Sequence, residues 1–412
     1  MKLKVLMFGW EFPPYNSGGL GTACAGLTQA LSLEDAQIIF VLPKKMDVKS
    51  NGVKFLFAQW PDSKLIQFDS LLTPYSTPKK YLKDKSKIKK AGYGMGIFEE
   101  VLRYAEYARE IAKELDFDVI HAHDWLAFKA GIEAKKISGK PLVVHIHSTE
   151  FDRTGGSNIN GDIYSIEKEG MEMADKVIVV SQFTKSMVIK NYGISQDKIH
   201  VIHNGINIDD YTLKNFELGP LGKLKEVGYK IVLFVGRLTI QKGPDYFIKA
   251  AKKVLDFNKK VFFLVVGSGD LERQVIQQSA ELGISDRVLF AGFLRGDELL
   301  RVYKMADCFV LSSVSEPFGI TALESIINGT PVILSKQSGV SEVLSHALKV
   351  DFWDTDEMAA KILSVLNYDA LHLSLRKNAL EEIKKSSWQE AAKQCLSVYR
   401  EVLDEYFNKM SN

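Results

Sequence analysis

The stretch that decides the fold is residues 313–342, SVSEPFGITALESIINGTPVILSKQSGVSE. It begins as a loop that carries Glu316 and continues as a helix that opens near Gly319. The helix ends at Asn328 and Gly329, and a short apolar strand follows over residues 331–334. A loop, a helix start and a following strand predict one βαβ-type unit, with the loop and the helix start on the same rim.

The chemistry of that rim follows from backbone and carboxylate groups. Backbone N–H groups at a helix N-terminus favour an anion such as a diphosphate. Two carboxylates, Glu316 and Glu324, flank this position, and a carboxylate that accepts from two neighbouring hydroxyls can hold a sugar or ribose diol. A phosphate between two diols describes a nucleotide sugar. The alternative is an ordinary amphipathic helix with a solvated glutamate, so the spacing of the two glutamates alone is weak evidence.

With EPFG before the helix and GTPVI after it, this stretch resembles the E-x7-E motif of retaining GT-B glycosyltransferases, the family 4 and glycogen (starch) synthase-like enzymes. The resemblance covers nearly the whole chain and implies an α/β GT-B fold, two Rossmann-like domains facing each other across a cleft. It implies that Glu316 holds the sugar hydroxyls and Glu324 the ribose diol. The residues expected to contact the donor at the helix start are Phe318, Gly319, Ile320 and Thr321.

Two cations are expected to act on the diphosphate. Arg237 and Lys242 lie in the loop after the apolar strand at residues 231–235, where positive charge can neutralise a departing diphosphate. As solvated loop charges they would be unremarkable, but GRL-xx-QKG resembles the family motif, and that likeness implies the diphosphate role for both. Farther along, VFFLVVGSGDLE repeats the order of strand, Gly-x-Gly and helix, and Gly267 and Gly269 are expected to leave room for the base or ribose.

The first half opens with a second glycine loop. An apolar strand over residues 3–8 leads to Gly18 and Gly19, and a helix-periodic run follows over residues 20–31. In this position the backbone N–H groups can approach a phosphate closely. The loop resembles the K-x-G-G loop of glycogen and starch synthases, except that Asn16 stands where those enzymes carry a lysine. That difference argues against ADP-glucose, the usual donor of those enzymes.

Histidines follow two short strands of the first half, in HAHDW and VVHIHS. For His121, His123 and His145 the favoured interpretation is buried rings satisfied by backbone groups. His147 stands where the segment resembles the T-x-H element of the family, which implies contact with the donor sugar near its 6-hydroxyl. Asn204 lies in a segment that resembles the NG-I-D turn, which implies an approach to the donor from the interdomain hinge.

A metal site is the third interpretation of these histidines. Two histidines at i and i+2 of a strand share one face, and Asp124 and Glu150 could complete a set of ligands. We expect no metal, because GT-B enzymes need none for chemistry. Cys24, Cys308 and Cys395 lie far apart without a CxxC pair, which argues against disulfides and thiolate metal sites and favours a reducing cytoplasm.

Length and composition limit the possible domain organisation and the possible partners. A chain of 412 residues suits two α/β domains, which we place at residues 1–212 and 213–387, with a last helix at 388–412 that returns to the first domain. A second helix is expected over residues 357–379. The net charge of +2 gives no reason to expect a nucleic-acid partner, and no apolar run is long enough to cross a membrane. The lysine-rich residues 79–90 are expected to form a solvated face.

The sequence therefore predicts a retaining hexosyltransferase, in first place a glucosyltransferase. The expected partners are a nucleotide-sugar donor, UDP-glucose before ADP-glucose, and a carbohydrate acceptor that could be glycogen or another α-glucan. No other cofactor is expected. The alternatives are transfer to a small-molecule or lipid acceptor, and a GT-B nucleotide-sugar epimerase. The linkage and the oligomeric state have no signal in the sequence.

Overall fold

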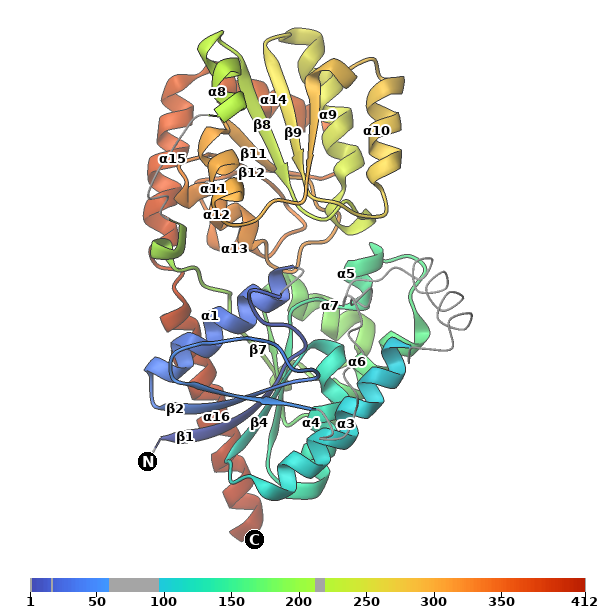
Figure 1. Ribbon diagram of the computed structural model, residues 1–412, viewed down its shortest axis with the longest axis vertical. Coiled ribbons are helices and arrows are strands. Elements are labelled where there is room, and N and C mark those ends of the chain that lie inside the picture. The colour runs from blue at the N-terminus through green and yellow to red at the C-terminus, as the bar shows by residue number, and fades with distance from the viewer. Residues whose placement is uncertain (1, 16–17, 59–95, 212–218, 412) are drawn as a thin grey trace. The chain divides into compact units, whose positions relative to one another are not determined.

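The computed structural model describes residues 2–15, 18–58, 96–211 and 219–411. Asn16 and the lysine-rich residues 79–90 lie outside them. The chain divides into two compact units (Figure 1). Unit 1 holds Met1–Phe151, Asn158–Gly205 and Trp388–Asn412, and unit 2 holds Asp152–Ser157 and Ile206–Ser387. The division between the units falls at Gly205, ahead of the boundary placed at residue 212.

Unit 1 is built on a parallel sheet that has, among the described residues, seven strands in the order β3-β2-β1-β4-β5-β6-β7. The strands are β1 (Leu3–Phe8), β2 (Ala36–Leu42), β3 (Val53–Phe57), β4 (Val119–His123), β5 (Leu142–Ile146), β6 (Lys176–Val179) and β7 (Ile199–Val201). The central strands are buried on both faces, as parallel strands covered by helices require. The predicted strand over residues 3–8 is confirmed.

Helices connect these strands and cover the sheet. They are α1 (Gly19–Leu33), α3 (Ile97–Glu114), α4 (Asp124–Ser138), α5 (Glu150–Thr154), α6 (Gly161–Met173) and α7 (Gln182–Tyr192). A short 3-10 turn, η1 (Gln196–Lys198), precedes β7. The core shared by the sheet and these helices includes Leu6, Ile120 and Val144, all of them inaccessible to solvent.

Unit 2 repeats the plan with a six-stranded parallel sheet, again counted over the described residues, in the order β10-β9-β8-β11-β12-β13. Its strands are β8 (Lys230–Val235), β9 (Val261–Val266), β10 (Val288–Gly292), β11 (Cys308–Leu311), β12 (Val332–Ser335) and β13 (Leu348–Val350). Its helices are α8 (Gly219–Glu226), α9 (Pro244–Phe257), α10 (Glu272–Glu281), α11 (Gly296–Met305), α12 (Ile320–Ile327), α13 (Val340–Val343), α14 (Thr355–Asn367) and α15 (Asp369–Ile383). Its 3-10 turns are η2 (Ile208–Tyr211), η3 (Ile240–Lys242) and η4 (Ser285–Arg287).

The helical structure expected over residues 357–379 is present but interrupted once, because the structure has two helices there, α14 and α15. They are separated at Tyr368, whose backbone is extended at φ −112° and ψ 95°. Asn367 and Asp369 flank this residue, and such short polar side chains favour helix ends over helix interiors. The apolar period continues across the break, which is why the sequence pattern did not reveal it.

The last helix, α16 (Trp388–Ser411), belongs to unit 1 and packs against α1 (Figure 1). A Cβ atom built on Gly26 of α1 would lie 2.2 Å from the Trp388 ring, so the absent side chain lets the two helices meet. Lys176 of β6 forms ion pairs with α16, at 2.6 Å to Glu401 and 2.7 Å to Glu405. Packing and charge therefore both hold this helix on unit 1.

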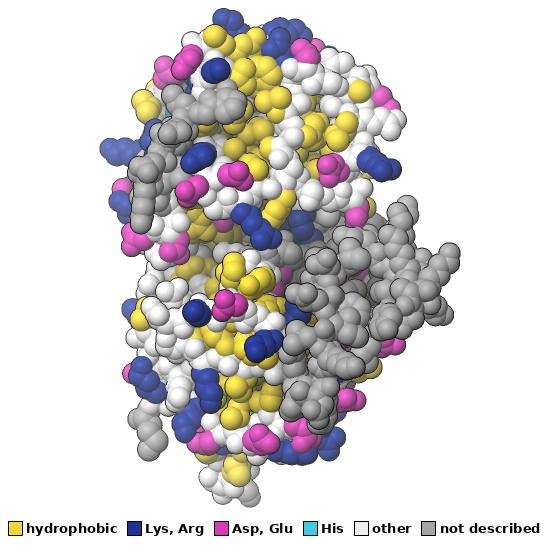
Figure 2. All heavy atoms as spheres, viewed as in Figure 1, with side chains coloured by type: hydrophobic (Ala, Val, Ile, Leu, Met, Phe, Trp, Pro, Cys, Tyr) yellow, Lys and Arg dark blue, Asp and Glu magenta, His cyan; other side chains and the backbone are white. Residues whose placement is uncertain are grey.

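Each sheet has a point at which the strand order reverses, between β1 and β4 in unit 1 and between β8 and β11 in unit 2. Ligands of open α/β sheets bind outside the carboxyl ends of the strands at such a point. Lysine and arginine side chains lie among aspartate and glutamate side chains over the face in Figure 2, as the net charge of +2 leads one to expect. None of the described helices is both long enough and apolar enough to span a membrane.

Candidate functional site

An ion pair lies at the reversal point of unit 2. Glu316 follows β11, and its Oε2 accepts a hydrogen bond from Lys242 Nζ at 2.5 Å and another from Ser313 Oγ at 3.0 Å. The glutamate side chain is 6% exposed and the lysine side chain 19% exposed. The pair is thus largely dehydrated, and the lysine ammonium keeps some contact with solvent.

The backbone of Glu316 is fixed by the loop after β12. Its N–H donates to the Gln337 carbonyl at 2.9 Å, and its carbonyl accepts from the Gly339 N–H at 2.9 Å. Glu316 and Ser338 form an isolated parallel bridge, and Ser338 Oγ donates back to the Ser335 carbonyl at 2.6 Å. This support rigidly orients the carboxylate that the sequence singled out.

The helix start predicted near Gly319 is confirmed, because α12 begins at Ile320 with Gly319 as its N-cap. Gly319 has φ 114°, a conformation that side chains rarely adopt, and a Cβ atom there would lie 3.0 Å from Val340 Cγ1. Phe318 is buried, and its carbonyl accepts from the Val340 N–H at 2.7 Å. Ile320 and Thr321 are half-buried in the first turn.

Glu324 lies in the same helix in a different environment. Tyr211 of η2 donates its hydroxyl to Glu324 Oε1 at 3.0 Å, and Tyr303 of α11 donates to Oε2 at 2.8 Å. Burial raises the pKa of the Glu324 carboxyl, and the two tyrosine hydroxyls act in the opposite direction. Sequence reasoning missed both tyrosines, because nothing in the local pattern links them to Glu324.

The loop that carries the two cations is tied to the Glu316 loop. Arg237 Nη2 donates to Gln241 Oε1 at 3.0 Å. The Gln241 carbonyl in turn accepts from the Val314 N–H at 2.9 Å. Gly243 has φ 57° and ends η3, and a Cβ atom there would lie 2.3 Å from the Ser312 carbonyl oxygen. Arg237, Lys242 and Glu316 therefore belong to one connected set of loops.

Gly267 and Gly269 make room for the protein's own backbone. A Cβ atom on Gly267 would lie 1.9 Å from the Gly236 carbonyl oxygen, and one on Gly269 would lie 2.4 Å from the Leu238 carbonyl oxygen. Gly267 also has φ 133°. These glycines thus let the loops after β8 and β9 pack together. The protein's own backbone therefore requires glycine here, in addition to the room that we expect a base or ribose to need.

In unit 1, the glycine loop leads directly into α1. Gly18 is the N-cap of α1 in an extended conformation, and a Cβ atom on Gly19 would meet nothing within 4 Å. Glu11 Oε1 accepts from the Gly21 N–H at 3.1 Å and so anchors the first turn. Asn204 is buried in the loop after β7. The contacts that we expect these residues to make with a donor stay predictions.

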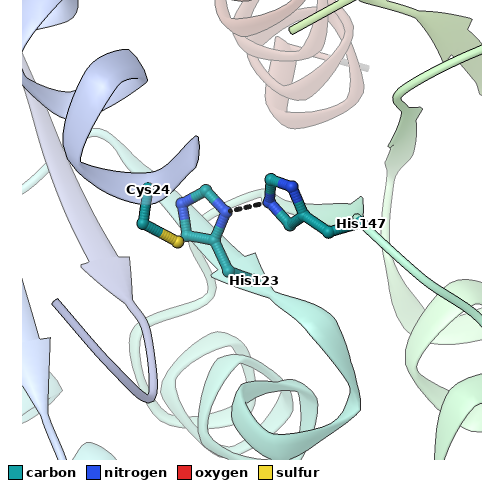
Figure 3. Close-up of side chains that lie close together, drawn as sticks. All are labelled: Cys24, His123 and His147. Carbon is teal, nitrogen blue, oxygen red and sulfur yellow. Dashed lines mark hydrogen bonds between the residues drawn. The ribbon is translucent and has the colours of Figure 1, made fainter. Parts of the chain in front are cut away.

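Four histidines of unit 1 form a buried stack in β4 and β5 and directly after β5. The ring centroids of His121 and His123 are 4.3 Å apart, and those of His145 and His147 are 4.2 Å apart. His123 Nδ1 and His147 Nε2 share a hydrogen bond of 3.0 Å (Figure 3). Burial is confirmed, but the expected backbone partners are wrong: His121 Nδ1 pairs with the Tyr399 hydroxyl of α16.

The environment of this stack keeps the rings neutral. Burial lowers the pKa of His121 and of His147 to about 3 each, and it lowers the pKa of His123 and His145 well below the ordinary value. The backbone of His147 is held by Asp124, whose Oδ1 accepts from the His147 N–H at 2.7 Å. Asp124 itself has φ 56°, an unusual conformation for a residue other than glycine. His123 and Asp124 are therefore positioning residues that the sequence interpretation did not assign.

Comparison with known proteins adds the family. The family profile described as Glycosyl transferases group 1 matches residues 222–382, and that described as Glycosyltransferase Family 4 matches residues 72–210. An uncharacterized glycosyltransferase of Methanocaldococcus jannaschii is 32% identical over 97% of this chain and 98% of its own. The chain belongs to the family 4 glycosyltransferases.

Other similar proteins agree with this assignment. The glycogen synthase of Mycobacterium tuberculosis is 25% identical to this glycosyltransferase over 96% of the chain and 94% of its own. Sucrose-phosphate synthase from Thermosynechococcus elongatus superposes with a TM-score of 0.76 at 21% identity, over 98% of this chain and 100% of its own. HepE of Anabaena in complex with UDP and glucose superposes with a TM-score of 0.71 at 19% identity, over 97% and 100% of the two chains. This glycosyltransferase has the GT-B fold.

Proposed function

We propose that this glycosyltransferase moves a glucosyl group from a nucleoside diphosphate sugar to an acceptor hydroxyl and retains the configuration at the anomeric carbon. The observation that carries the proposal is the Lys242–Glu316 pair at the reversal point of the unit 2 sheet, beside the start of α12. There a cation, a carboxylate and a helix N-terminus occur together. These are the groups that a diphosphate and a sugar diol need.

The difficulty of the reaction is charge. The anomeric carbon becomes oxocarbenium-like while negative charge grows on the leaving diphosphate, so fixed cations and N–H groups lower the barrier. The proposal assigns this task to Arg237, Lys242 and the first turn of α12. Glu316 holds the sugar hydroxyls. Hydrogen bonds between the Glu316 backbone and the backbone of Gln337 and Gly339 hold the residue in place for this role.

Retention needs either two displacements or attack on the face of the leaving group. The first route requires a carboxylate on the opposite face of the sugar, and no residue of the chain is assigned to it. We therefore propose front-face attack, in which a diphosphate oxygen takes the proton of the acceptor hydroxyl as the new glycosidic bond forms and the bond to the diphosphate breaks. No metal and no cofactor besides the donor takes part, so transfer should persist in the presence of a chelator.

Glu324 receives the ribose diol in this proposal. Its two oxygens already accept from Tyr211 and Tyr303, and each carboxylate oxygen has a second lone pair for a ribose hydroxyl. The proposal also assigns Gly18, Gly19, His147, Asn204, Gly267 and Gly269 to the donor. Of these, His147 contacts the sugar near its 6-hydroxyl.

UDP-glucose is the first donor to test, because the fold neighbour HepE is described in complex with UDP and glucose. Asn16, in place of the lysine of glycogen and starch synthases, points away from ADP-glucose. An α-glucan is the first acceptor to test, because a glycogen synthase aligns over 96% of the chain. The second candidate is a small-molecule acceptor, favoured by a D-inositol 3-phosphate glycosyltransferase of Mycolicibacterium smegmatis that is 29% identical over 70% of the chain.

The test is the release of nucleoside diphosphate from UDP, ADP and GDP sugars, each with and without glycogen and inositol phosphate. Release that needs one acceptor, with a product of retained anomeric configuration by NMR, supports the proposal and names the acceptor. An epimerase would instead release nucleotide without any acceptor. Absence of release from every donor, with Glu316→Gln equal to the parent in donor binding, would refute the site. Lys242→Met should slow the release of nucleoside diphosphate. Lys249→Met is its matched control, because Lys249 is an exposed lysine on α9.

A further inference from the structure

Three side chains of unit 1, one of them that of His147, lie close together although they come from different elements. Cys24 comes from α1, His123 ends β4, and His147 follows β5. One donor atom from each residue lies within 4.8 Å of the other two, and all three side chains are buried. Figure 3 shows the sulfur of Cys24 and the ring of His147 next to the ring of His123. These residues are far apart in the sequence, and only the sheet brings them together.

The donor types and their spacing suit a zinc-class ion. Zinc binds thiolate sulfur at about 2.3 Å and imidazole nitrogen at about 2.0–2.1 Å in a tetrahedron, which places neighbouring ligand atoms roughly 3.3–3.7 Å apart. His123 Nδ1 and His147 Nε2 are 3.0 Å apart. The separation of these two nitrogens is therefore within a few tenths of an ångström of that in a chelating pair.

The second nitrogen of each ring makes no hydrogen bond with the described residues that would oppose so small a shift. His123 Nε2 and His147 Nδ1 are buried, and neither has a hydrogen-bond partner among the described residues. Because neither ring is fixed through its second nitrogen, both can turn a lone pair toward Cys24 without losing another hydrogen bond. Buried imidazole nitrogens without partners are also unusual, since each costs free energy unless something binds it.

The charges around the site favour a cation. Both rings are buried, so an ion bound between them would be shielded from water. The carboxylates of Asp124 and Glu11 interact electrostatically with the Cys24 thiol. A bound divalent ion would displace the thiol proton, and the thiolate and these two carboxylates would then offset its charge.

We infer that Cys24, His123 and His147 form a binding site for a zinc-class ion. An ion bound to His147 prevents that ring from contacting the donor sugar, so metal binding inhibits transfer. This consequence rests on the function proposed for His147. Another trio, His121, His123 and His145, also brings its donor atoms within 4.8 Å of one another. It shares His123 but has no thiolate to offset the charge of the ion.

The experiment titrates the chelator-treated full chain with Co²⁺, which replaces zinc and reports thiolate ligation by a charge-transfer absorption band. We expect one cobalt per chain, the band in the parent, and no band with at least tenfold weaker binding in Cys24→Ser. Cys308→Ser is the matched control, because Cys308 is a buried cysteine of unit 2. His145→Asn separates the two trios and should keep the band. Thermal melting of each metal-free variant verifies that it folds, and Cys24→Ala replaces Cys24→Ser if the latter does not.

Several outcomes would overturn the inference. They are no cobalt bound, a band that survives in Cys24→Ser, and a band that is lost in His145→Asn. Inhibition is measured separately: Zn²⁺ should lower transfer at least tenfold in the parent and leave Cys24→Ser unaffected. If cobalt binds as expected but Zn²⁺ does not inhibit, the metal site stands and the role proposed for His147 fails.

Discussion

Lys242→Met separates the structural and the catalytic contributions of the Lys242–Glu316 pair. Methionine keeps most of the side-chain stem and removes the ammonium that lies 2.5 Å from Glu316 Oε2. Removing one partner of a buried pair costs about 3–5 kcal/mol, because the other charge stays buried without compensation. Ser313 Oγ still donates to the same oxygen at 3.0 Å, so we expect the lower end, about 3 kcal/mol.

The same substitution removes one fixed cation from the departing diphosphate. The loss of one such group costs about 2.7–4 kcal/mol of the barrier, a decrease in kcat of about 10²–10³. For a domain of roughly 150–250 residues, about 3 kcal/mol of lost stability lowers Tm by about 6–12 °C. The two effects are measured separately, by calorimetry or circular dichroism and by nucleoside diphosphate release at a temperature below both transitions.

A second substitution distinguishes the two contributions. In Lys242→Met/Glu316→Gln the buried charge is gone, so most of the lost stability should return, while kcat stays at or below the value of the single variant. Lys249→Met should change stability by less than about 0.5 kcal/mol, because its partner Asp245 lies at 3.3 Å on an exposed helix face. The reasoning is refuted if Lys242→Met melts at the parent temperature. It is also refuted if the double variant regains activity together with stability.

Three further changes test other parts of the structure. Gly269→Ala should destabilise unit 2 by about 1–3 kcal/mol in thermal melts, because its Cβ would lie 2.4 Å from the Leu238 carbonyl oxygen. Gly19→Ala is the control and should melt like the parent, because a Cβ there would meet nothing within 4 Å. Glu324→Gln should gain stability relative to the parent as pH rises above 4.5, because the raised pKa of the Glu324 carboxyl destabilises the folded parent at a pH where the unfolded chain is ionised. Urea unfolding of both proteins at acidic and at neutral pH measures this difference. A difference in unfolding free energy that does not change with pH would contradict the prediction. Deleting residues 388–412 should abolish cooperative unfolding of unit 1, because α16 supplies buried core residues.

The fold could be predicted because its signals are local and continuous. Strands such as β1 and β8 are largely apolar, and each is followed directly by a glycine. The position of Gly319 at the start of α12 also followed from the sequence alone. Glu316 and Lys242 were each selected from a motif, but their direct contact depends on how the loops after β8 and β11 pack, and no local pattern encodes that packing.

The parts that the sequence did not reveal depend on contacts between distant segments. Tyr303 reaches Glu324 from α11, and Tyr399 reaches His121 from α16 at the far end of the chain. Cys24 was judged only by its distance from other cysteines, although its neighbours in space are histidines. Sequence motifs therefore selected candidate site residues and did not show which of them contact one another.

The two glutamates of the E-x7-E motif differ in what surrounds them, and that difference assigns their tasks. Glu316 faces an ammonium and a hydroxyl, so its negative charge is compensated at the position where we propose that sugar hydroxyls and a diphosphate meet. Glu324 faces two tyrosine hydroxyls, and burial opposes its ionisation. A carboxylate beside a developing diphosphate would repel it unless a cation lay between them. Lys242 meets that requirement for Glu316, whereas Glu324 has no such cation among the described residues and accepts hydrogen bonds from neutral hydroxyls, as a ribose would also present.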